Sequence, residues 1–424
     1  MRIAFSSFGC KINQVETEEM VRAAVDGGSS IVPFEDRADV YVINTCSVTG
    51  KSDYQCRQAI RAAVRRGKGA QVIVTGCYAE MRPEEIRKIP GVSAVISNRD
   101  KDSLIPAVMT DLRKSASKVE QADVPVPGGR TRSFLKVQDG CDNYCSYCLI
   151  PYARGRSRSV DFQQVVEQFD TAVSSGTPEV VLSGIHIGKY GLDLQPGRTL
   201  SELLVELLAR RKEARIRLSS IEPREVSVDI VSMAGRGLCR HLHVPLQSGD
   251  DTILKAMNRD YDSGFYRELM HSIAASVPGI ALGADVIVGF PGEGDREFEN
   301  TLSLIRDCPI THLHVFTYSR RPGTAAAAMP NQVNEEDKRE RSRILRELAL
   351  QKNLIFRRKF VGSTLRVAIE SGEHQQNGSI FKGMTDNYIR VTVSGAVEAD
   401  IGKEIDVAIN AVSESDTMGA SVTH

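Results

Sequence analysis

The sequence predicts an α/β multidomain protein: an N-terminal parallel α/β domain, a central partial barrel of six βα units, and a small all-β barrel at the C-terminal end. Three observations support this fold class. Apolar runs alternate with amphipathic stretches over residues 1–114, the same alternation resumes near residue 131, and short strand patterns replace it after residue 360. With 424 residues, the chain is long enough for two to four domains with buried cores.

The N-terminal domain is predicted from strands that are each followed by a helix, the order that a parallel sheet requires. After it, residues 115–130 lose all periodicity and are rich in Ser, Pro and Gly, which predicts a linker. The expected strand and helix pairs are Arg2–Phe8 with Val15–Val25, Val40–Asn44 with Ser52–Arg66, and Gln71–Thr75 with Pro83–Lys88.

The central domain, residues 131–359, is predicted to contain six parallel strands and to end in a charged helix over about residues 334–359. Its expected strands are Phe134–Gln138, Glu179–Ser183, Arg215–Ser219, His241–Leu246, Ala284–Val288 and His312–Thr317. The pattern leaves open whether this sheet closes. Residues 360–424 are expected to form the all-β domain, with strands at Thr364–Ile369, Tyr388–Val393 and Ile405–Ile409 and a frayed polar tail.

Composition excludes several classes of protein. Lys+Arg and Asp+Glu both number 54, so the global charge indicates neither a nucleic-acid partner nor a membrane surface. No apolar run approaches the roughly 20 residues that span a bilayer, and the first residues resemble a strand rather than a signal peptide. We therefore expect a cytoplasmic protein without membrane contact, in which the presence of nine cysteines favours metal ligation over structural disulfides.

Cys141, Cys145 and Cys148 form the most informative motif, Cys-x3-Cys-x2-Cys, with no fourth Cys or His close by. Structural zinc requires four closed ligands, so no zinc is expected. Three thiolates on a 4Fe-4S cluster leave one iron open, and this iron can chelate S-adenosylmethionine. The spacing, with aromatic Tyr147 before the third Cys, resembles the radical S-adenosylmethionine superfamily, which implies a (βα)6 barrel and a 5′-deoxyadenosyl radical.

A second trio, Cys10, Cys46 and Cys77, follows three predicted strands, so the thiols are expected at one edge of the sheet. They form either a second three-thiolate site or three buried, inert thiols. Residues 9–17, 43–49 and 75–79 resemble the N-terminal domain of the methylthiotransferases, whose chains also end in a small β-barrel called TRAM. The resemblance implies two 4Fe-4S clusters: the open iron of the second carries the sulfur, and a second S-adenosylmethionine supplies the methyl group.

The remaining cysteines match no ligand motif. Cys56 shares a helical face with Ile60 and Val64, which favours packing, and Cys239 and Cys308 lie just before predicted strands.

Cofactor contacts are expected at the carboxyl ends of the barrel strands. By resemblance, Tyr147 lies against the adenine of S-adenosylmethionine, and four more positions lie near the cofactor: Gly184, Ser220, Gln247 and Ile287. Alternatively, some of these residues merely form turns. No side chain is assigned a catalytic role, because the radical abstracts the hydrogen; of His241 and His243, at least one is expected to pack in the core.

The substrate is predicted from residues 151–155, 183–188 and 219–223, which resemble the bacterial branch acting on N6-threonylcarbamoyladenosine. The resemblance implies reaction at carbon 2 of this base, at position 37 in the anticodon stem-loop of tRNA, with an electron donor such as flavodoxin or ferredoxin. Two other branches stay open, one acting on isopentenyladenosine in tRNA and one on an aspartate of a ribosomal protein. A non-catalytic iron–sulfur scaffold or electron carrier is the hypothesis from another class.

Local charge gives divided support for an RNA partner. Basic side chains cluster in three places, as phosphate contacts require, although such runs are often solvated helix faces. Residues 360–424 hold four Lys or Arg against nine Asp or Glu, which departs from expectation for an RNA-binding domain. The clusters are Arg57, Arg61, Arg65, Arg66 and Lys68; Arg154, Arg156 and Arg158; and Arg357, Arg358 and Lys359.

Overall fold

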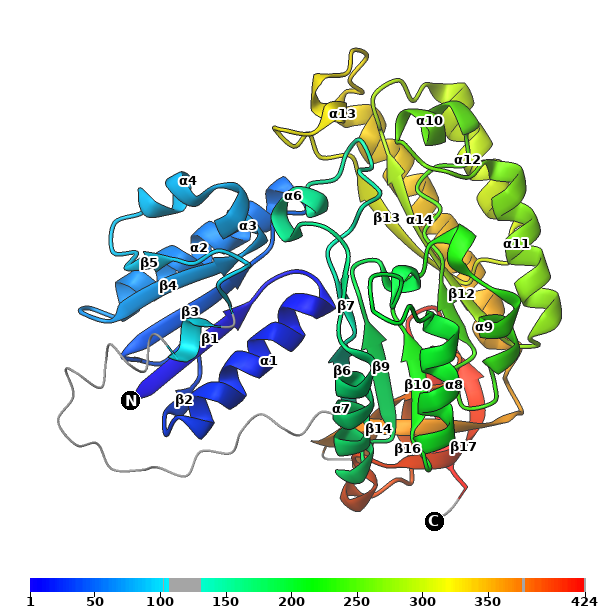
Figure 1. Cartoon of the computed structure of the whole chain (residues 1–424). Helices are drawn as coiled ribbons and strands as arrows, with labels where there is room; N and C mark the ends of the chain where they lie inside the picture. Colours follow the sequence, from blue (N-terminus) through cyan, green and yellow to red (C-terminus); the bar gives the residue numbers. More distant parts are fainter. Residues whose placement is uncertain (102, 107–130, 376–377, 423–424) are drawn as a thin grey trace. The chain divides into compact units, whose positions relative to one another are not determined.

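The computed structural model describes residues 1–101, 103–106, 131–375 and 378–422. The predicted linker, 115–130, lies outside the described residues. The chain divides into two compact units (Figure 1). The N-terminal unit joins residues 1–128 to the segments 140–156 and 319–327, and the barrel unit contains residues 129–139, 157–318 and 328–424.

The N-terminal unit is built on a parallel five-stranded sheet in the order β2-β1-β3-β4-β5. This confirms the predicted parallel α/β fold; the edge strands β2 and β5 escaped prediction because they have only three and two residues. The strands are β1 Arg2–Ser7, β2 Ser30–Val32, β3 Val40–Thr45, β4 Gln71–Gly76 and β5 Ala94–Val95; the helices are α1 Lys11–Asp26, α2 Gly50–Arg66, α3 Cys77–Met81, α4 Pro83–Arg87 and α6 Ile150–Arg154.

Both faces of this sheet are buried, which explains why its strands are continuous apolar runs. Ile3 and Val42 pack with Met20 of α1 on one face. Tyr41 and Ile43 pack with α2 on the other face. Figure 1 shows α1 and α2 on opposite sides of the strands.

The barrel unit contains the six predicted parallel strands, arranged as two three-stranded sheets, β10-β9-β6 and β11-β12-β13. This confirms a partial barrel. The strand β12 begins three residues earlier than predicted, because Gly283 interrupts the apolar pattern there. The strands are β6 Arg132–Lys136, β9 Glu179–Ser183, β10 Arg215–Leu218, β11 His241–His243, β12 Ala281–Val288 and β13 His312–Thr317, with the short pair β7 Gln138–Asp139 and β8 Arg158–Ser159.

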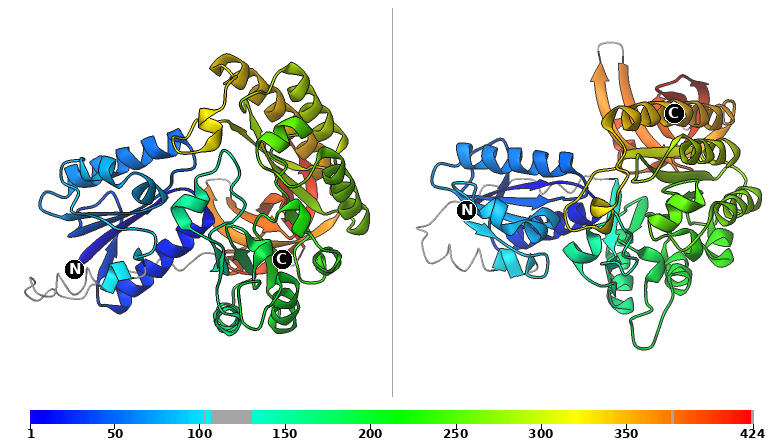
Figure 2. Two further views of the ribbon diagram at one scale, coloured as in Figure 1. Left: turned by 45° about the horizontal axis from the view of Figure 1, so that its top comes forward. Right: turned by 90° about the horizontal axis from the view of Figure 1, so that it is seen from above.

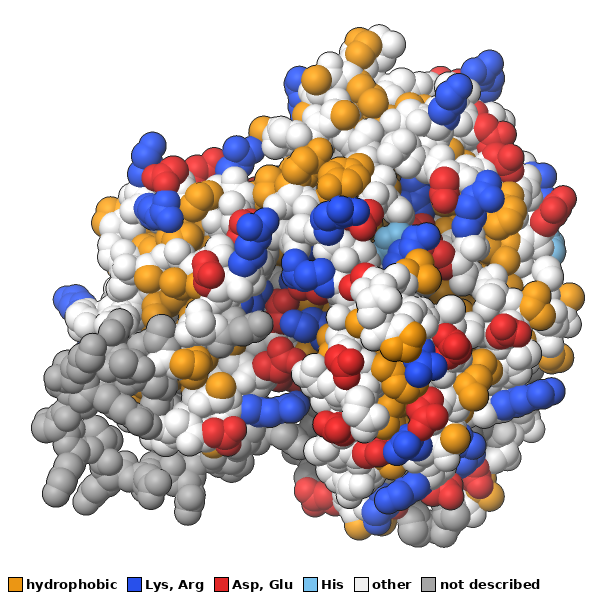
Figure 3. Space-filling view, in the orientation of Figure 1, with side chains coloured by type: hydrophobic (Ala, Val, Ile, Leu, Met, Phe, Trp, Pro, Cys, Tyr) orange, Lys and Arg blue, Asp and Glu red, His pale blue; other side chains and the backbone are white. Residues whose placement is uncertain are grey.

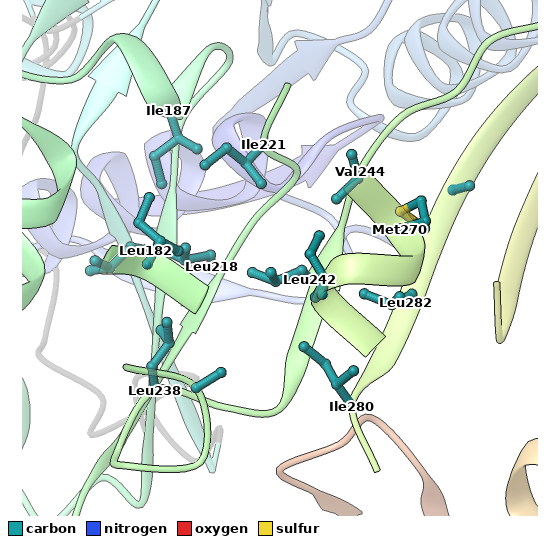
Figure 4. Close-up of a cluster of buried hydrophobic side chains, with 14 of the residues drawn as sticks. Leu182, Ile187, Leu218, Ile221, Leu238, Leu242, Val244, Met270, Ile280 and Leu282 are labelled. Carbon is teal, nitrogen blue, oxygen red and sulfur yellow. The ribbon is translucent and has the colours of Figure 1, made fainter. Parts of the chain in front are cut away.

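Helices cover the outer face of these strands, as the green and yellow ribbons of Figure 2 show. Leu182, Leu218, Leu242 and Leu282 come from four strands and meet in one buried cluster with Met270 (Figure 4). On several strands the alternate positions are polar, such as Arg215 and Arg217 of β10, His241 and His243 of β11, and Asp285 of β12. The helices of this unit are α7 Phe162–Ser174, α8 Leu200–Arg210, α9 Val228–Met233, α10 Asp251–Ala256, α11 Ser263–Ser276, α12 Asp295–Asp307 and α14 Glu335–Arg358, with the 3-10 turns η1 Ile187–Lys189, η2 Pro223–Glu225 and η3 Glu398–Asp400. The short α13 Ala325–Ala328 lies largely in the segment 319–327 of the N-terminal unit.

The predicted all-β region forms a closed barrel in the order β14-β15-β16-β18-β17. The expectation of a frayed tail was wrong for residues 417–421, because they form β18 and pair with both β16 and β17. Its inward positions are Thr417 and Gly419, which give no apolar alternation for sequence analysis to detect. The strands are β14 Thr364–Gln375, β15 Gly378–Thr385, β16 Arg390–Ser394, β17 Glu404–Val412 and β18 Thr417–Ser421.

No helix within the described residues is both long enough and apolar enough to cross a membrane.

Candidate functional site

Cys10, Cys46 and Cys77 lie at the carboxyl edge of the N-terminal sheet, each at the end of a different strand. Cys46 directly follows β3, Cys77 directly follows β4, and Cys10 is the residue before α1. Gly9 has φ +92°, and a Cβ added there would lie 2.5 Å from the Cys46 Sγ. The sheet therefore brings the three predicted thiols together, and only glycine fits between two of them.

The surroundings of this trio suit a metal cluster. Burial, with smaller contributions from the neighbouring Cys77 and Cys10, raises the pKa of the Cys46 thiol to about 11. Burial also raises the pKa of Cys77, while the nearby Arg154 guanidinium lowers it. Three adjacent thiolates repel one another unless a cation neutralises them, and metal binding deprotonates thiols outright. The donor set thus fits a cluster held by three cysteines.

Cys56 touches this trio but does not join it. Its Sγ accepts a hydrogen bond of 3.5 Å from the Cys46 backbone amide and lies, fully buried, in the apolar cluster with Ile60. The packing role predicted for Cys56 is confirmed. Cys239 and Cys308 lie in the barrel unit, where both are buried.

Cys141, Cys145 and Cys148 lie on one loop between β7 and α6, and this loop belongs to the N-terminal unit. The backbone amides of Asn143 and Ile150 donate to the sulfurs of Cys141 and Cys148, both at 3.4 Å. Amides directed at sulfur stabilise thiolates, so this loop also fits an anionic cluster. Tyr147 lies on the same loop, as predicted.

A buried ion network ties this loop to the N-terminal sheet. Arg154 of α6 donates to Glu16 at 3.0 Å and to Asn13 at 2.5 Å. Lys101 donates to the same Glu16 carboxylate at 2.6 Å. The Asn98 side-chain amide donates to the Ala153 carbonyl at 2.7 Å and lies 3.9 Å from the Cys77 Sγ. Both cysteine trios therefore belong to one compact unit.

Sequence reasoning missed these connecting residues. Glu16 and Arg154 are 138 positions apart, and no local pattern joins them. Arg154 itself was counted in a basic cluster, but the structure uses it internally rather than offering it to phosphate. Arg357 of α14 is likewise occupied, because it donates to the carbonyls of Glu414 and Asp416.

The segment 319–327 adds a second tie within this unit. Arg321 donates to Asp53 at 2.5 Å and to Ser47, the neighbour of Cys46, at 2.9 Å. The Ala326 amide donates to the Ser146 carbonyl at 2.8 Å. The segment 319–327 thus binds a residue adjacent to a cysteine in each trio, Ser47 next to Cys46 and Ser146 next to Cys145. No sequence motif had indicated this connection.

The predicted cofactor contacts of the barrel unit lie toward the carboxyl ends of its strands: Gly184 after β9, Ser220 after β10, Gln247 after β11 and Ile287 within β12. Gln247 has φ +67°, a conformation that non-glycine residues rarely adopt. Its backbone is fixed by bonds to Asp285 at 2.8 Å and Ile287 at 2.9 Å. Such strain is common at functional sites, but contact of these residues and Tyr147 with S-adenosylmethionine stays a prediction.

The inner face of the barrel strands carries a polar cluster that the sequence did not reveal. His243 and His314 lie 2.9 and 3.1 Å from the Asp285 carboxylate. Burial opposes ionisation of Asp285, but hydrogen bonds from the two histidines outweigh it and hold its pKa well below the usual range. His241 is buried and stacks on Tyr388, which confirms that one of the two β11 histidines packs in the core.

Two family models match the sequence: residues 2–97 match the uncharacterized protein family UPF0004, and residues 135–305 match the radical SAM superfamily. The threonylcarbamoyladenosine tRNA methylthiotransferase MtaB of Bacillus subtilis is 39% identical over 96% of this chain and 93% of that protein. The Aquifex aeolicus MtaB is 37% identical over 96% of this chain and all of that protein. A tRNA-2-methylthio-N(6)-dimethylallyladenosine synthase of Fusobacterium nucleatum is 30% identical, covering 95% of this chain and 96% of that protein.

Among solved structures, the radical S-adenosylmethionine methyltransferase TsrM of Kitasatospora setae superposes with a TM-score of 0.58 at 13% identity, covering 88% of this chain and 79% of that chain. This likeness concerns the fold alone.

Proposed function

The chain belongs to the radical S-adenosylmethionine methylthiotransferases, and from that premise we propose that it attaches a methylthio group to carbon 2 of N6-threonylcarbamoyladenosine at position 37 of tRNA. The main support for this proposal is that two sites of three cysteines each lie in the same compact unit. The substrate follows the relatives described above, of which the most similar are named for threonylcarbamoyladenosine.

The proposed cofactors are two 4Fe-4S clusters and S-adenosylmethionine. When bound, they would supply the electron, the radical, the sulfur and the methyl group. Cys141, Cys145 and Cys148 would hold one cluster, and Cys10, Cys46 and Cys77 the other. A trio of thiolates leaves an iron open, whereas a simple electron carrier closes each cluster with four. No zinc is proposed, because each motif supplies three cysteines, whereas structural zinc requires four ligands.

The chain's own residues would bind and orient these groups. Backbone amides of the Cys141–Cys148 loop stabilise the thiolates, and the Arg154–Glu16–Lys101 network fixes the loop on the N-terminal sheet. In the barrel unit, the strand ends with Gly184, Ser220 and Gln247 would hold S-adenosylmethionine.

A tRNA partner is proposed to contact basic side chains through its phosphates. Arg61, Arg65 and Lys68 are exposed at helical spacing on and just beyond α2. Over the barrel unit, basic and acidic side chains are interspersed on the face shown in Figure 3, so a few local contacts would serve rather than one broad field. We propose flavodoxin or ferredoxin as the electron donor and, since tRNA is modified there, the cytoplasm as the site of reaction.

Two alternatives remain as outcomes of the test. The first is isopentenyladenosine as the substrate, because the chain is also similar to a dimethylallyladenosine synthase. The second is a ribosomal protein as the substrate, since that branch uses the same cofactors. A scaffold without catalysis would bind iron but change no nucleoside.

The test compares tRNA nucleosides by mass spectrometry from cells lacking the gene, complemented with the wild-type chain or with Cys46→Ala. We expect 2-methylthio-N6-threonylcarbamoyladenosine only with the wild-type chain, and its unmethylthiolated precursor in the other cells. A change in the isopentenyladenosine derivative instead would reassign the substrate. No change in any nucleoside or in the ribosomal protein would favour the scaffold.

A further inference from the structure

Asn98 lies in the N-terminal unit between α3, which begins with Cys77, and α6, which follows the Cys141–Cys148 loop. It follows β5, and its backbone amide donates to the Glu80 carboxylate at 2.8 Å. Glu80 belongs to α3, the short helix that begins with Cys77. The position of Asn98 over the Cys77 thiol is therefore fixed through its backbone.

The side chain of Asn98 bridges two acceptors. Its Nδ2 donates to the Ala153 carbonyl at 2.7 Å and to the Cys77 Sγ at 3.9 Å. A carbonyl oxygen and a thiolate sulfur can only accept hydrogen bonds. Exchanging the nitrogen and oxygen of the Asn98 amide would place its oxygen next to these two acceptors, so the orientation with the nitrogen toward them is the favourable one. The Oδ1 atom is buried and has no hydrogen-bond partner among the described residues. This orientation leaves an oxygen unsatisfied in order to direct both N–H groups at Ala153 and Cys77.

The charged side chains near Cys77 nearly balance. The buried cations Arg154 and Lys101 pair with Glu16, and Glu80 adds a second carboxylate beside Asn98. The N–H donor of Asn98 is therefore the feature that stabilises negative charge on the sulfur. Because a reduced cluster carries one more negative charge than an oxidised one, this donor favours reduction.

We propose that Asn98 is a positioning residue for the cluster held by Cys10, Cys46 and Cys77. Its amide raises the reduction potential of that cluster through the hydrogen bond to Cys77. The same amide links Cys77 to α6, the helix that follows the Cys141–Cys148 loop. This inference rests on the second cluster proposed above. It assigns a role to a residue outside the cysteine motifs.

The test isolates this cluster in the full chain carrying Cys141→Ala, Cys145→Ala and Cys148→Ala, reconstituted with iron and sulfide under anaerobic conditions. Redox titration followed by electron paramagnetic resonance then measures the midpoint potential. Asn98→Ala should move the potential to a more negative value with iron and sulfide contents unchanged. Asn98→Asp should move it further, because a carboxylate replaces the donor with a like charge.

Ser97→Ala is the matched control. Ser97 is the chain neighbour of Asn98, and its hydroxyl bonds to Asp100 rather than to sulfur. Its replacement should leave the potential unchanged. If Asn98→Ala and Ser97→Ala give the same potential as the parent chain, the amide does not act on the cluster and the inference is overturned.

A second measurement keeps Asn98 in place, in case its variants fail to hold the cluster. In the parent chain labelled with 15N in asparagine side chains, pulsed electron paramagnetic resonance of the reduced cluster should detect coupling to an amide nitrogen. Absence of that coupling contradicts the inference alone. If the parent chain binds no cluster, the proposed second cluster fails as well, so the two failures are distinguishable.

Discussion

Cys46 and Cys56 touch each other, yet their surroundings give them different roles. Cys46 lies at the sheet edge with Cys10 and Cys77, whereas Cys56 packs among apolar side chains of α2. We predict that Cys46→Ala removes about half of the bound iron, because one of two clusters loses a ligand. Cys56→Ala should keep all the iron and lower the free energy of unfolding by about 1–2 kcal/mol, from lost packing. Iron assay and urea unfolding check both, and equal iron loss in the two variants would contradict the assignment.

His312 makes the barrel unit sensitive to acid. Burial, followed by the charges of His314 and His243, lowers the pKa of the His312 imidazole to about 4, from an ordinary value of 6.5. His312 stays neutral in the folded state, whereas the unfolded state takes up a proton below pH 6.5. The free energy of unfolding should therefore be unaffected by this residue above pH 6.5 and should fall by about 2–3 kcal/mol as the pH approaches 4. His312→Asn should flatten the pH dependence of urea unfolding in this window. An unchanged slope in His312→Asn would contradict this assignment.

At the scale of elements, β10 joins the half-barrel to the small β-barrel within the barrel unit. The fully buried Arg217 pairs with Glu179 at 2.7 Å and donates to the Thr385 and Asp386 carbonyls at 2.9 and 3.0 Å. Arg217→Ala leaves a buried carboxylate and two carbonyls short of partners, so we expect a loss of about 3 kcal/mol or more. Urea unfolding measures this loss. Arg210 also pairs with acidic side chains but lies in solvent, so Arg210→Ala should change the unfolding midpoint little. An equally small effect of Arg217→Ala would show that Arg217 does not stabilise the contact between β10 and the small β-barrel.

The helix α2 presents its basic residues in two ways. Arg57 is held by the Tyr78 hydroxyl at 3.0 Å, while Arg61 and Arg65 are exposed one turn apart. We predict that Arg61→Glu with Arg65→Glu weakens tRNA binding and makes log Kd less dependent on log salt, by about 0.7–0.9 for each phosphate that is no longer neutralised. The exposed Arg339 of α14 is the control, because Arg339→Glu makes the same kind of charge change on another helix. Equal effects of both changes would indicate a general charge effect rather than a binding face.

The sequence alone predicted the features that depend on local patterns. The long strands of both units are apolar runs between helices, and Cys141, Cys145 and Cys148 lie within eight residues. It missed β15 and β18 because glycines such as Gly383 and Gly419 stand where an apolar side chain would mark a strand, and at both a Cβ would lie within 3 Å of a neighbouring strand. Asn98, Lys101 and Arg321 were also missed, since only the folded chain brings such distant residues to the cysteines.

At the scale of the whole molecule, the two cysteine trios share one compact unit but should serve separable steps. Only the Cys141–Cys148 loop carries the motif that resembles the S-adenosylmethionine site, so the triple variant Cys10→Ala, Cys46→Ala, Cys77→Ala should still release 5′-deoxyadenosine. It should hold about half of the wild-type iron and form no methylthio product, because the proposed sulfur-carrying cluster is absent. Replacing Cys141, Cys145 and Cys148 by Ala should abolish both products. Anaerobic assays with reductant and tRNA, read by mass spectrometry, distinguish these outcomes. If the first variant still methylthiolates tRNA, Cys10, Cys46 and Cys77 do not hold the sulfur donor.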